Sequence, residues 1–163
     1  EIFRFLKKYV PGCEDARLLC SGSTLGIRES RHIHGEKTLT LEDIIEGRTP
    51  HDSVLVCSNS ADIHGRFGPK SNEYVVIQNG DWYGIPYGCL VPQRIDGLLL
   101  AGRCFSATSD AAGAVRVMPP CMCMGQAAGI AASLSAQQCM NPRNIQPAQV
   151  RETLRQQGAF LPD

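Results

Sequence analysis

The sequence predicts a mixed α/β fold with α+β character, and three features of the chain support this. Its 163 residues are 43% hydrophobic and 20% charged, a composition typical of a globular domain. Segments with helical spacing of apolar residues are interspersed with short, strand-like segments. One of these, residues 97–102, is continuously apolar between two glycines, as expected for a strand that is covered on both faces.

Apolar spacing, capping residues and terminating glycines divide the chain into elements. The helices are expected at residues 1–10, at 41–46 after the cap Thr40, at 121–138, and in a final segment marked by Val150 and Leu154. Strands are expected at residues 18–25, 27–35, 53–57, 73–79 and 95–101, with an extended segment at 83–92, a loop at 58–72 and an irregular loop up to residues 119–120.

The charge balance argues against some partners. Sixteen basic and sixteen acidic residues give a formal net charge of zero, which provides no field to attract nucleic acid or an anionic membrane surface. The longest uncharged run, residues 117–142, contains prolines and several polar side chains, unlike a spanning helix. We therefore expect no nucleic-acid partner, no membrane association and a cytoplasmic location.

The eight cysteines include no CxxC spacing, which a zinc ribbon or a thioredoxin-type pair requires. Most are expected to be small buried hydrophobic residues. A redox pair at Cys121 and Cys123 is an alternative, as is a metal site at His32 and His34 with His64 as a third ligand. No carboxylate pattern completes that site, so no metal is predicted.

The predicted helix over residues 121–138 is rich in glycine and alanine. Two glycines, Gly125 and Gly129, each cost a helix about 1 kcal/mol relative to alanine, so ordinary core filling does not explain them. Small side chains indicate that something approaches closely. The approaching group is either a packed sheet or an electron-rich ligand that the positive helix end attracts.

Several motifs occur in an order that we recognise. Residues 96–108, 116–119 and 124–129, together with 25–33 and 85–92 upstream, closely resemble the carboxy-terminal part of FAD-dependent oxidoreductases related to the fumarate reductase flavoprotein and the glutathione reductase superfamily. The similarity runs from about residue 17 to residue 161. It implies a partial FAD-binding three-layer domain at 93–163 and a β-rich substrate-side region at 1–92.

The resemblance also implies a cofactor and its site. FAD would lie with its ribityl or pyrophosphate portion along Gly102 and Arg103, and its isoalloxazine ring near Arg116, Val117 and Met118. Two departures stand out: relatives often carry Arg at position 32, where this chain has His, and His at position 109, where it has Ser.

The dinucleotide fingerprint GxGxxG is absent from this sequence, although it binds the FAD pyrophosphate in complete enzymes of this class. We therefore expect these residues to be the carboxy-terminal part of a longer flavoprotein, with the remaining amino-terminal part as a partner. Exposed apolar strand surface also favours a homodimer.

Residues 28–34 are the second candidate site. If this segment is a regular strand, Arg28, Ser30, His32 and His34 share one face and Arg31 lies on the other. Arg28 and Arg31 are the candidate anchors for an anionic group of a small-molecule substrate, and His34 is a candidate proton donor, which makes these three the catalytic candidates. The alternative is a solvated strand face in which Arg31 pairs with Glu29 or Glu36.

Together these features predict an oxidoreductase that moves hydride or electrons between a small organic substrate and FAD. The sequence leaves two rivals open. One is a non-catalytic binding or self-associating module that keeps the fold without the cofactor, and the other is a cysteine-based redox or metal protein.

Overall fold

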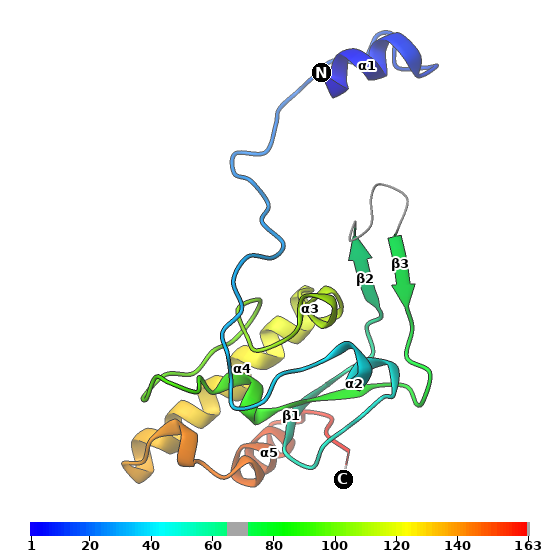
Figure 1. Cartoon of the computed structure of the whole chain (residues 1–163). Coiled ribbons are helices and arrows are strands. Elements are labelled where there is room, and N and C mark those ends of the chain that lie inside the picture. The colour runs from blue at the N-terminus through cyan, green and yellow to red at the C-terminus, as the bar shows by residue number, and fades with distance from the viewer. Residues whose placement is uncertain (65–71, 163) are drawn as a thin grey trace.

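A computed structural model describes residues 1–64 and 72–162 of the chain (Figure 1). It combines helices with two small antiparallel sheets, so the predicted mixed α/β character is confirmed. The α-helices are α1 (Ile2–Tyr9), α2 (Leu41–Ile45), α3 (Ser109–Val115), α4 (Met118–Gln138) and α5 (Pro147–Gln156), with short 3-10 helices η1 (Tyr87–Leu90) and η2 (Pro142–Asn144).

The inner sheet pairs β1 (Ser53–Cys57) with β4 (Tyr83–Pro86) in antiparallel register, with Leu55 opposite Ile85. The outer sheet pairs β2 (Ala61–His64) with β3 (Asn72–Val75). The four residues of β4 and most of β1 are buried, because α4 and α5 both pack against β1.

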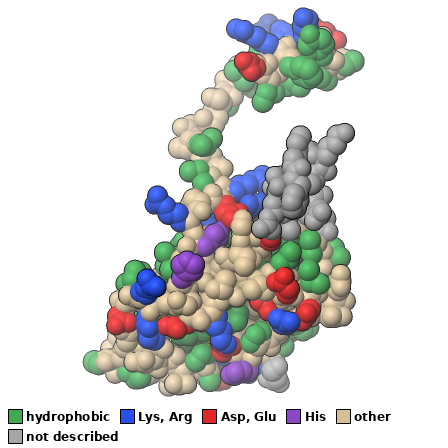
Figure 2. All heavy atoms as spheres, in the orientation of Figure 1, with side chains coloured by type: hydrophobic (Ala, Val, Ile, Leu, Met, Phe, Trp, Pro, Cys, Tyr) green, Lys and Arg blue, Asp and Glu red, His purple; other side chains and the backbone are tan. Residues whose placement is uncertain are grey.

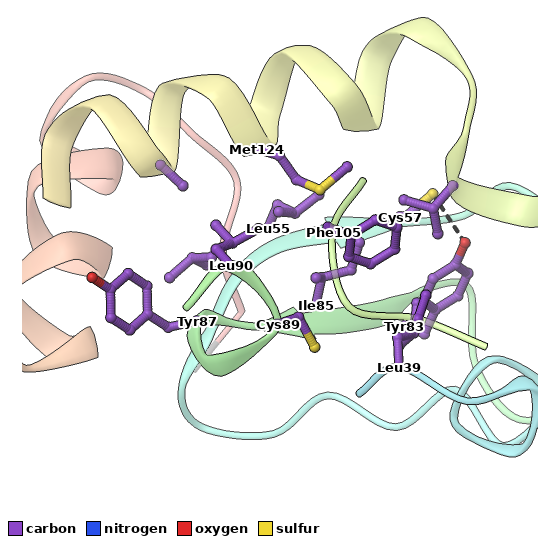
Figure 3. Close-up of a cluster of buried hydrophobic side chains, with 14 of the residues drawn as sticks. Leu39, Leu55, Cys57, Tyr83, Ile85, Tyr87, Cys89, Leu90, Phe105 and Met124 are labelled. Carbon is purple, nitrogen blue, oxygen red and sulfur yellow. Dashed lines mark hydrogen bonds between the residues drawn. The ribbon is translucent and has the colours of Figure 1, made fainter. Parts of the chain in front are cut away.

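Figure 3 shows the core between α4 and the inner sheet, where Met124 of α4 points toward Leu55 and Phe105. All three side chains are at most 4% exposed. Beside them the Tyr83 hydroxyl donates to Cys57 Sγ over 3.2 Å, which gives a buried polar group a partner. The core therefore comes from segments on both sides of the predicted boundary at residues 92 and 93.

Local sequence explains the helix starts. Asp43 N donates to Thr40 Oγ1 at 3.3 Å and Thr40 N donates to Asp43 Oδ2 at 3.0 Å, a reciprocal capping box that begins α2 as predicted. Helix α4 begins three residues before the predicted start, because proline is tolerated in the first turn of a helix.

The predicted strands at 18–25, 27–35 and 95–101 are wrong. These segments are extended but lie outside regular strands, and among the described residues they make only isolated backbone bonds to other segments, such as Leu100 N to Leu90 O at 2.8 Å. A strand requires a neighbour with which to form a hydrogen-bonded ladder, and apolar patterning alone does not supply that neighbour.

Three further expectations need correction. The segment expected to be extended at 83–92 contains the 3-10 helix η1 after β4. The predicted loop at 58–72 contains β2, while residues 65–71 of it lie outside the described residues. The irregular loop before residue 119 contains α3, which Thr108 caps by accepting from Ala111 N. Helix α3 is short and built of small residues, and it packs so closely on β2 that a Cβ on Gly113 would lie 3.0 Å from Asp62 O.

No single helix in the described part of the chain is both long and apolar enough to cross a membrane. The bent pair α3 and α4 passes the same test only together, across a 95° break, and residues 111–115 of α3 are buried in the core. The predicted absence of a membrane partner stays a prediction.

The amino-terminal segment forms an arm, residues 1–34, that leaves the body of the protein (Figure 1). It carries α1, which buries none of its residues. The arm first meets the body around residues 27–35, where Ile33 N donates to Cys104 O at 3.1 Å.

Candidate functional site

The carboxylate of Glu29 fastens the arm to the body. Its Oε1 accepts from Ser109 Oγ at 2.7 Å and contacts His32 Nε2 at 3.2 Å, and its Oε2 contacts Arg116 Nη1 at 3.3 Å. The side chain of Glu29 is 24% exposed and that of Arg116 16%. One partly buried acid thus joins the arm to the first residue of α3 and the residue that ends it.

Arg116 is shared between two elements. Its Nη2 donates to Asp62 O of β2 at 3.3 Å while its Nη1 contacts Glu29. The resemblance implies that Arg116 approaches a flavin ring, and the geometry gives its guanidinium two partners within the protein. Arg116 therefore positions Glu29 and the arm.

The imidazole of His32 is held at both nitrogens. Nδ1 lies 3.2 Å from Phe105 O and Nε2 lies 3.2 Å from Glu29 Oε1. A carbonyl and a carboxylate both accept hydrogen bonds, so the ring of His32 is held between the backbone of Phe105 and the side chain of Glu29.

A pocket of about 370 Å³ opens where the arm meets the body, and it is rich in arginine. Arg28, Arg31 and Arg103 line it, with Cys104 and three neighbouring arm residues. Its one acid is Glu29, whose oxygens are already bonded to Ser109, His32 and Arg116. The pocket therefore has an excess of positive charge.

A second pocket, of about 400 Å³, is formed by the next residues of the same segment. It is lined by His32, His34 and Arg94 with Ile33, Pro92, Gln93 and Ile95, and none of these seven side chains is acidic. Histidine side chains gather near Lys and Arg side chains where the arm meets the body (Figure 2). We refer to the two arginine-containing pockets together as the cationic site.

The cationic site brings together residues that the sequence analysis treated separately. Arg28 and Arg31 share a pocket with Arg103, which was assigned to the cofactor, and His34 lies in the neighbouring pocket. The expected alternation of a strand is not observed, because residues 28–31 line one pocket and residues 32–34 the other. Glu29 and Glu36 pair with Arg116 and Arg143 rather than with Arg31.

Sequence reasoning missed Arg94 and the role of Glu29. Arg94 follows Pro92 in the motif at 85–92, so its place just beyond a recognised motif was the available signal. Glu29 lies within the motif at 25–33, but its partners Ser109 and Arg116 are 80 and 87 residues away along the chain.

The residues assigned to the cofactor lie on exposed turns and a helix start. Gly102 has a φ of 81°, and a Cβ there would have no neighbour within 4 Å. Arg103 donates to Ile27 O across the pocket. Val117 and Met118, at the start of α4, are 38% and 80% exposed, and burial raises the pKa of the Cys121 thiol behind them.

These features fit the chemistry of FAD. Exposed apolar side chains at the start of α4 suit a flat aromatic ring, and a guanidinium beside an open glycine suits the negatively charged part of a dinucleotide. The two prolines at the start of α4 contribute no N–H groups, so donors from that helix begin at Cys121.

The comparison with family models decides the assignment. Residues 1–154 match the model of the FAD dependent oxidoreductase family. The chain belongs to this family. No curated protein and no solved structure matches the chain. FAD is the cofactor of the family, which agrees with the cofactor that the sequence predicts.

The expectation that most cysteines are buried is wrong, because only Cys57 and Cys89 of the eight are buried. All eight cysteines are free thiols, and Cys121 is half-buried while Cys123, two residues further along α4, is exposed. Within the described ranges, no group of three or more His, Cys, Asp and Glu side chains is placed to hold a metal ion. The side chain of His64, considered as a third ligand, lies outside the described residues.

Proposed function

We propose that this chain forms the substrate-side and flavin-ring-side part of an FAD-dependent oxidoreductase that acts on a small organic anion. One observation carries the proposal: Arg28, Arg31 and Arg103 line a single pocket. The one acid of that pocket, Glu29, is already paired with Arg116. A carboxylate or phosphate group is the ligand that such an arginine cluster recognises.

Four residues would hold the cofactor: Gly102 and Arg103 along its ribityl or pyrophosphate portion, and Val117 and Met118 against its ring. The chemistry that FAD would supply there is the exchange of hydride or electrons with the substrate. Arg116 contributes to substrate binding indirectly. Its contacts with Glu29 and Asp62 O hold in place the arm that carries Arg28 and Arg31.

The protein's own residues would bind the substrate and exchange a proton with it. Arg28 and Arg31 anchor the anionic group, and both are exposed at the pocket wall. His34, whose ring nitrogens have no partner among the described residues, is the candidate to exchange a proton with the substrate. His32 has a hydrogen-bond partner at each ring nitrogen, and it therefore holds in place the wall of the pocket that contains His34.

The proposal includes a second contributor to the FAD site. Because GxGxxG is absent from the sequence, we propose that the amino-terminal part of a parent flavoprotein binds the pyrophosphate. We also propose that the assembled enzyme works in the cytoplasm. This chain alone would then bind FAD weakly and be inactive.

An FAD titration followed by flavin fluorescence tests the proposal. We expect saturable quenching that R103A weakens about tenfold, the equivalent of one charge-assisted contact. R4A, which removes an arginine from α1 far from the cationic site, is the matched control. Equal affinity of the wild type and R103A would rule out this assignment of the flavin site.

A self-associating module is the second candidate function, and a specific observation favours it. The arm and α4 expose apolar faces that the described chain leaves uncovered. The exposed apolar face of α4 includes Met118, which the flavin proposal places against the ring, so association through that part of α4 would compete with flavin binding.

A further inference from the structure

Arg143 lies in η2, the short 3-10 helix between α4 and α5, and the surrounding chain fixes its backbone there. The side-chain oxygen of Asn141 accepts a hydrogen bond from Arg143 N at 3.1 Å, which begins η2. The buried hydroxyl of Tyr87 donates to Pro142 O at 2.8 Å and connects η2 to η1, directly after β4. The side chain of Arg143 therefore starts from a fixed position.

The guanidinium of Arg143 is bonded to the turn that follows η1. Its Nη2 donates to Pro92 O at 2.7 Å, and both Nη1 and Nη2 donate to Gln93 O at 3.1 Å. Glu36 and Asp96 add ion pairs at 2.9 Å and 3.3 Å, but their side chains are 42% and 74% exposed. Exposed ion pairs contribute little, so the bonds to the two carbonyls are the stronger part of this arrangement.

The same turn is paired with the end of the arm. Gln93 N donates to His34 O at 3.0 Å, and Pro92 forms an isolated antiparallel bridge with Gly35. Pro92 is fully buried, and Arg143 supplies a donor for its carbonyl, which a buried carbonyl requires. Arg143 thus holds the turn on one side while the arm holds it on the other.

This turn forms part of the wall of the second pocket in the cationic site, where Arg94 and His34 lie together. Arg94 makes no hydrogen bond or ion pair with the residues that the structure describes, so its charge is available to a ligand. Arg143 lines the different pocket of about 600 Å³, and its guanidinium is already bonded to the turn. The two arginines therefore have different roles.

We propose that Arg143 is a positioning residue for anion binding, and that it acts by holding the turn that carries Arg94. This inference rests on the proposed function, which assigns the cationic site to a small organic anion. The forked guanidinium of Arg143 reaches two successive carbonyls, which a single ammonium group does not reproduce. A turn that is already ordered loses less conformational freedom when the anion binds, so the affinity is higher.

An NMR titration with inorganic phosphate, followed on the ring of His34, tests the proposal. Arg143→Gln should raise the dissociation constant about fivefold or more, and Arg143→Lys should do the same because lysine keeps the charge but loses the fork. Arg48→Gln is the matched control, because it removes an arginine that also pairs with two acids. Wild-type affinity in Arg143→Lys with a loss in Arg143→Gln would overturn the proposal, because charge alone would then explain the effect.

A double substitution tests whether Arg143 acts through Arg94. Arg94→Gln combined with Arg143→Gln should raise the dissociation constant no more than about twofold beyond Arg94→Gln alone, because two residues that act as one unit have non-additive effects. Fold-changes of the two single substitutions that multiply in the double variant would show independent contributions and would overturn the proposal.

Amide hydrogen exchange tests the positioning without any ligand. In Arg143→Gln the amide of Gln93, which donates to His34 O, should exchange about tenfold faster, while that of Ile33, which donates to Cys104 O, should not change. An unchanged rate at Gln93, or phosphate binding that Arg143→Gln leaves unaltered, would overturn this inference alone. A wild type that binds no phosphate would overturn the proposed cationic site together with this inference.

Discussion

Ser109 donates a hydrogen bond of 2.7 Å to Oε1 of Glu29, a residue 80 positions earlier in the chain. His32 contacts the same oxygen at 3.2 Å. In this chain the imidazole comes from the arm, and a single carboxylate oxygen connects it to Ser109.

The first prediction concerns the stability that Glu29 provides. Glu29→Gln removes the charge that holds Arg116 and His32, so we expect the free energy of unfolding in urea to fall by about 1–3 kcal/mol. Glu36→Gln is the control, because Glu36 pairs with Arg143 in a more exposed setting and its loss should cost less than about 1 kcal/mol. Equal effects of the two substitutions would contradict a special role for Glu29.

The second prediction is a loss of stability in alkali. Burial raises the pKa of Cys89 from 9.0 to about 12 and that of Tyr87 from 10.0 to about 12. The folded protein keeps protons that the unfolded chain releases, so their contribution is complete below pH 9 and disappears as the pH rises toward 12. For Cys89 alone the free energy of unfolding should fall by at most about 1.4 kcal/mol per pH unit.

A pH series of urea unfolding curves measures this. In Cys89→Ala the decline should begin near pH 10, where the tyrosines start to titrate, rather than near pH 9. Superimposable alkaline declines for the variant and the wild type would show that Cys89 does not titrate as described.

The third prediction concerns the close approach at Gly35, next to His34. A Cβ there would lie 2.7 Å from Ser106 Cβ and 2.8 Å from Gly88 O, so Gly35→Ala should destabilise the fold by about 1–3 kcal/mol. Gly26→Ala, with no atom within 4 Å, should change stability by less than about 0.5 kcal/mol. Thermal unfolding followed by circular dichroism distinguishes the two, and an unchanged Tm for Gly35→Ala would be the contrary result.

The fourth prediction tests the cationic site with inorganic phosphate as the probe. Phosphate should shift the NMR signals of the His32 and His34 rings, and Arg94→Gln should weaken this binding about tenfold. Arg48→Gln, which removes a surface arginine already paired with Asp43 and Glu46, should leave the titration unchanged. Histidine signals that do not respond to phosphate would contradict an anion site in this pocket.

The sequence predicted the elements that local chemistry specifies. The cap at Thr40, the amphipathic spacing of α1 and the short apolar run of β1 all depend on residues close together in the chain. The strands expected at 18–25, 27–35 and 95–101 failed because a strand depends on a distant partner. Helix α3 was missed because its alanines and glycine carry little periodic signal, and its burial depends on β2.

For the candidate site, the sequence predicted the residues but not the contacts between them. The motifs indicated the residues of the flavin side and the arm, and the structure places Arg28, Arg31 and Arg103 in one pocket. The contacts of Glu29 with Ser109 and Arg116 follow from the tertiary fold and could not be obtained from residue spacing.

Hydrogen exchange with and without FAD, followed by mass spectrometry, tests the central claim most directly. A flavin bound as proposed should protect backbone amides in three separated segments: residues 27–34, 102–106 and 117–122. The pocket of about 600 Å³ that Lys37 and Arg143 line elsewhere on the protein should exchange at an unchanged rate. Protection at that second pocket instead, or no protection of the three segments at saturating FAD, would contradict the account.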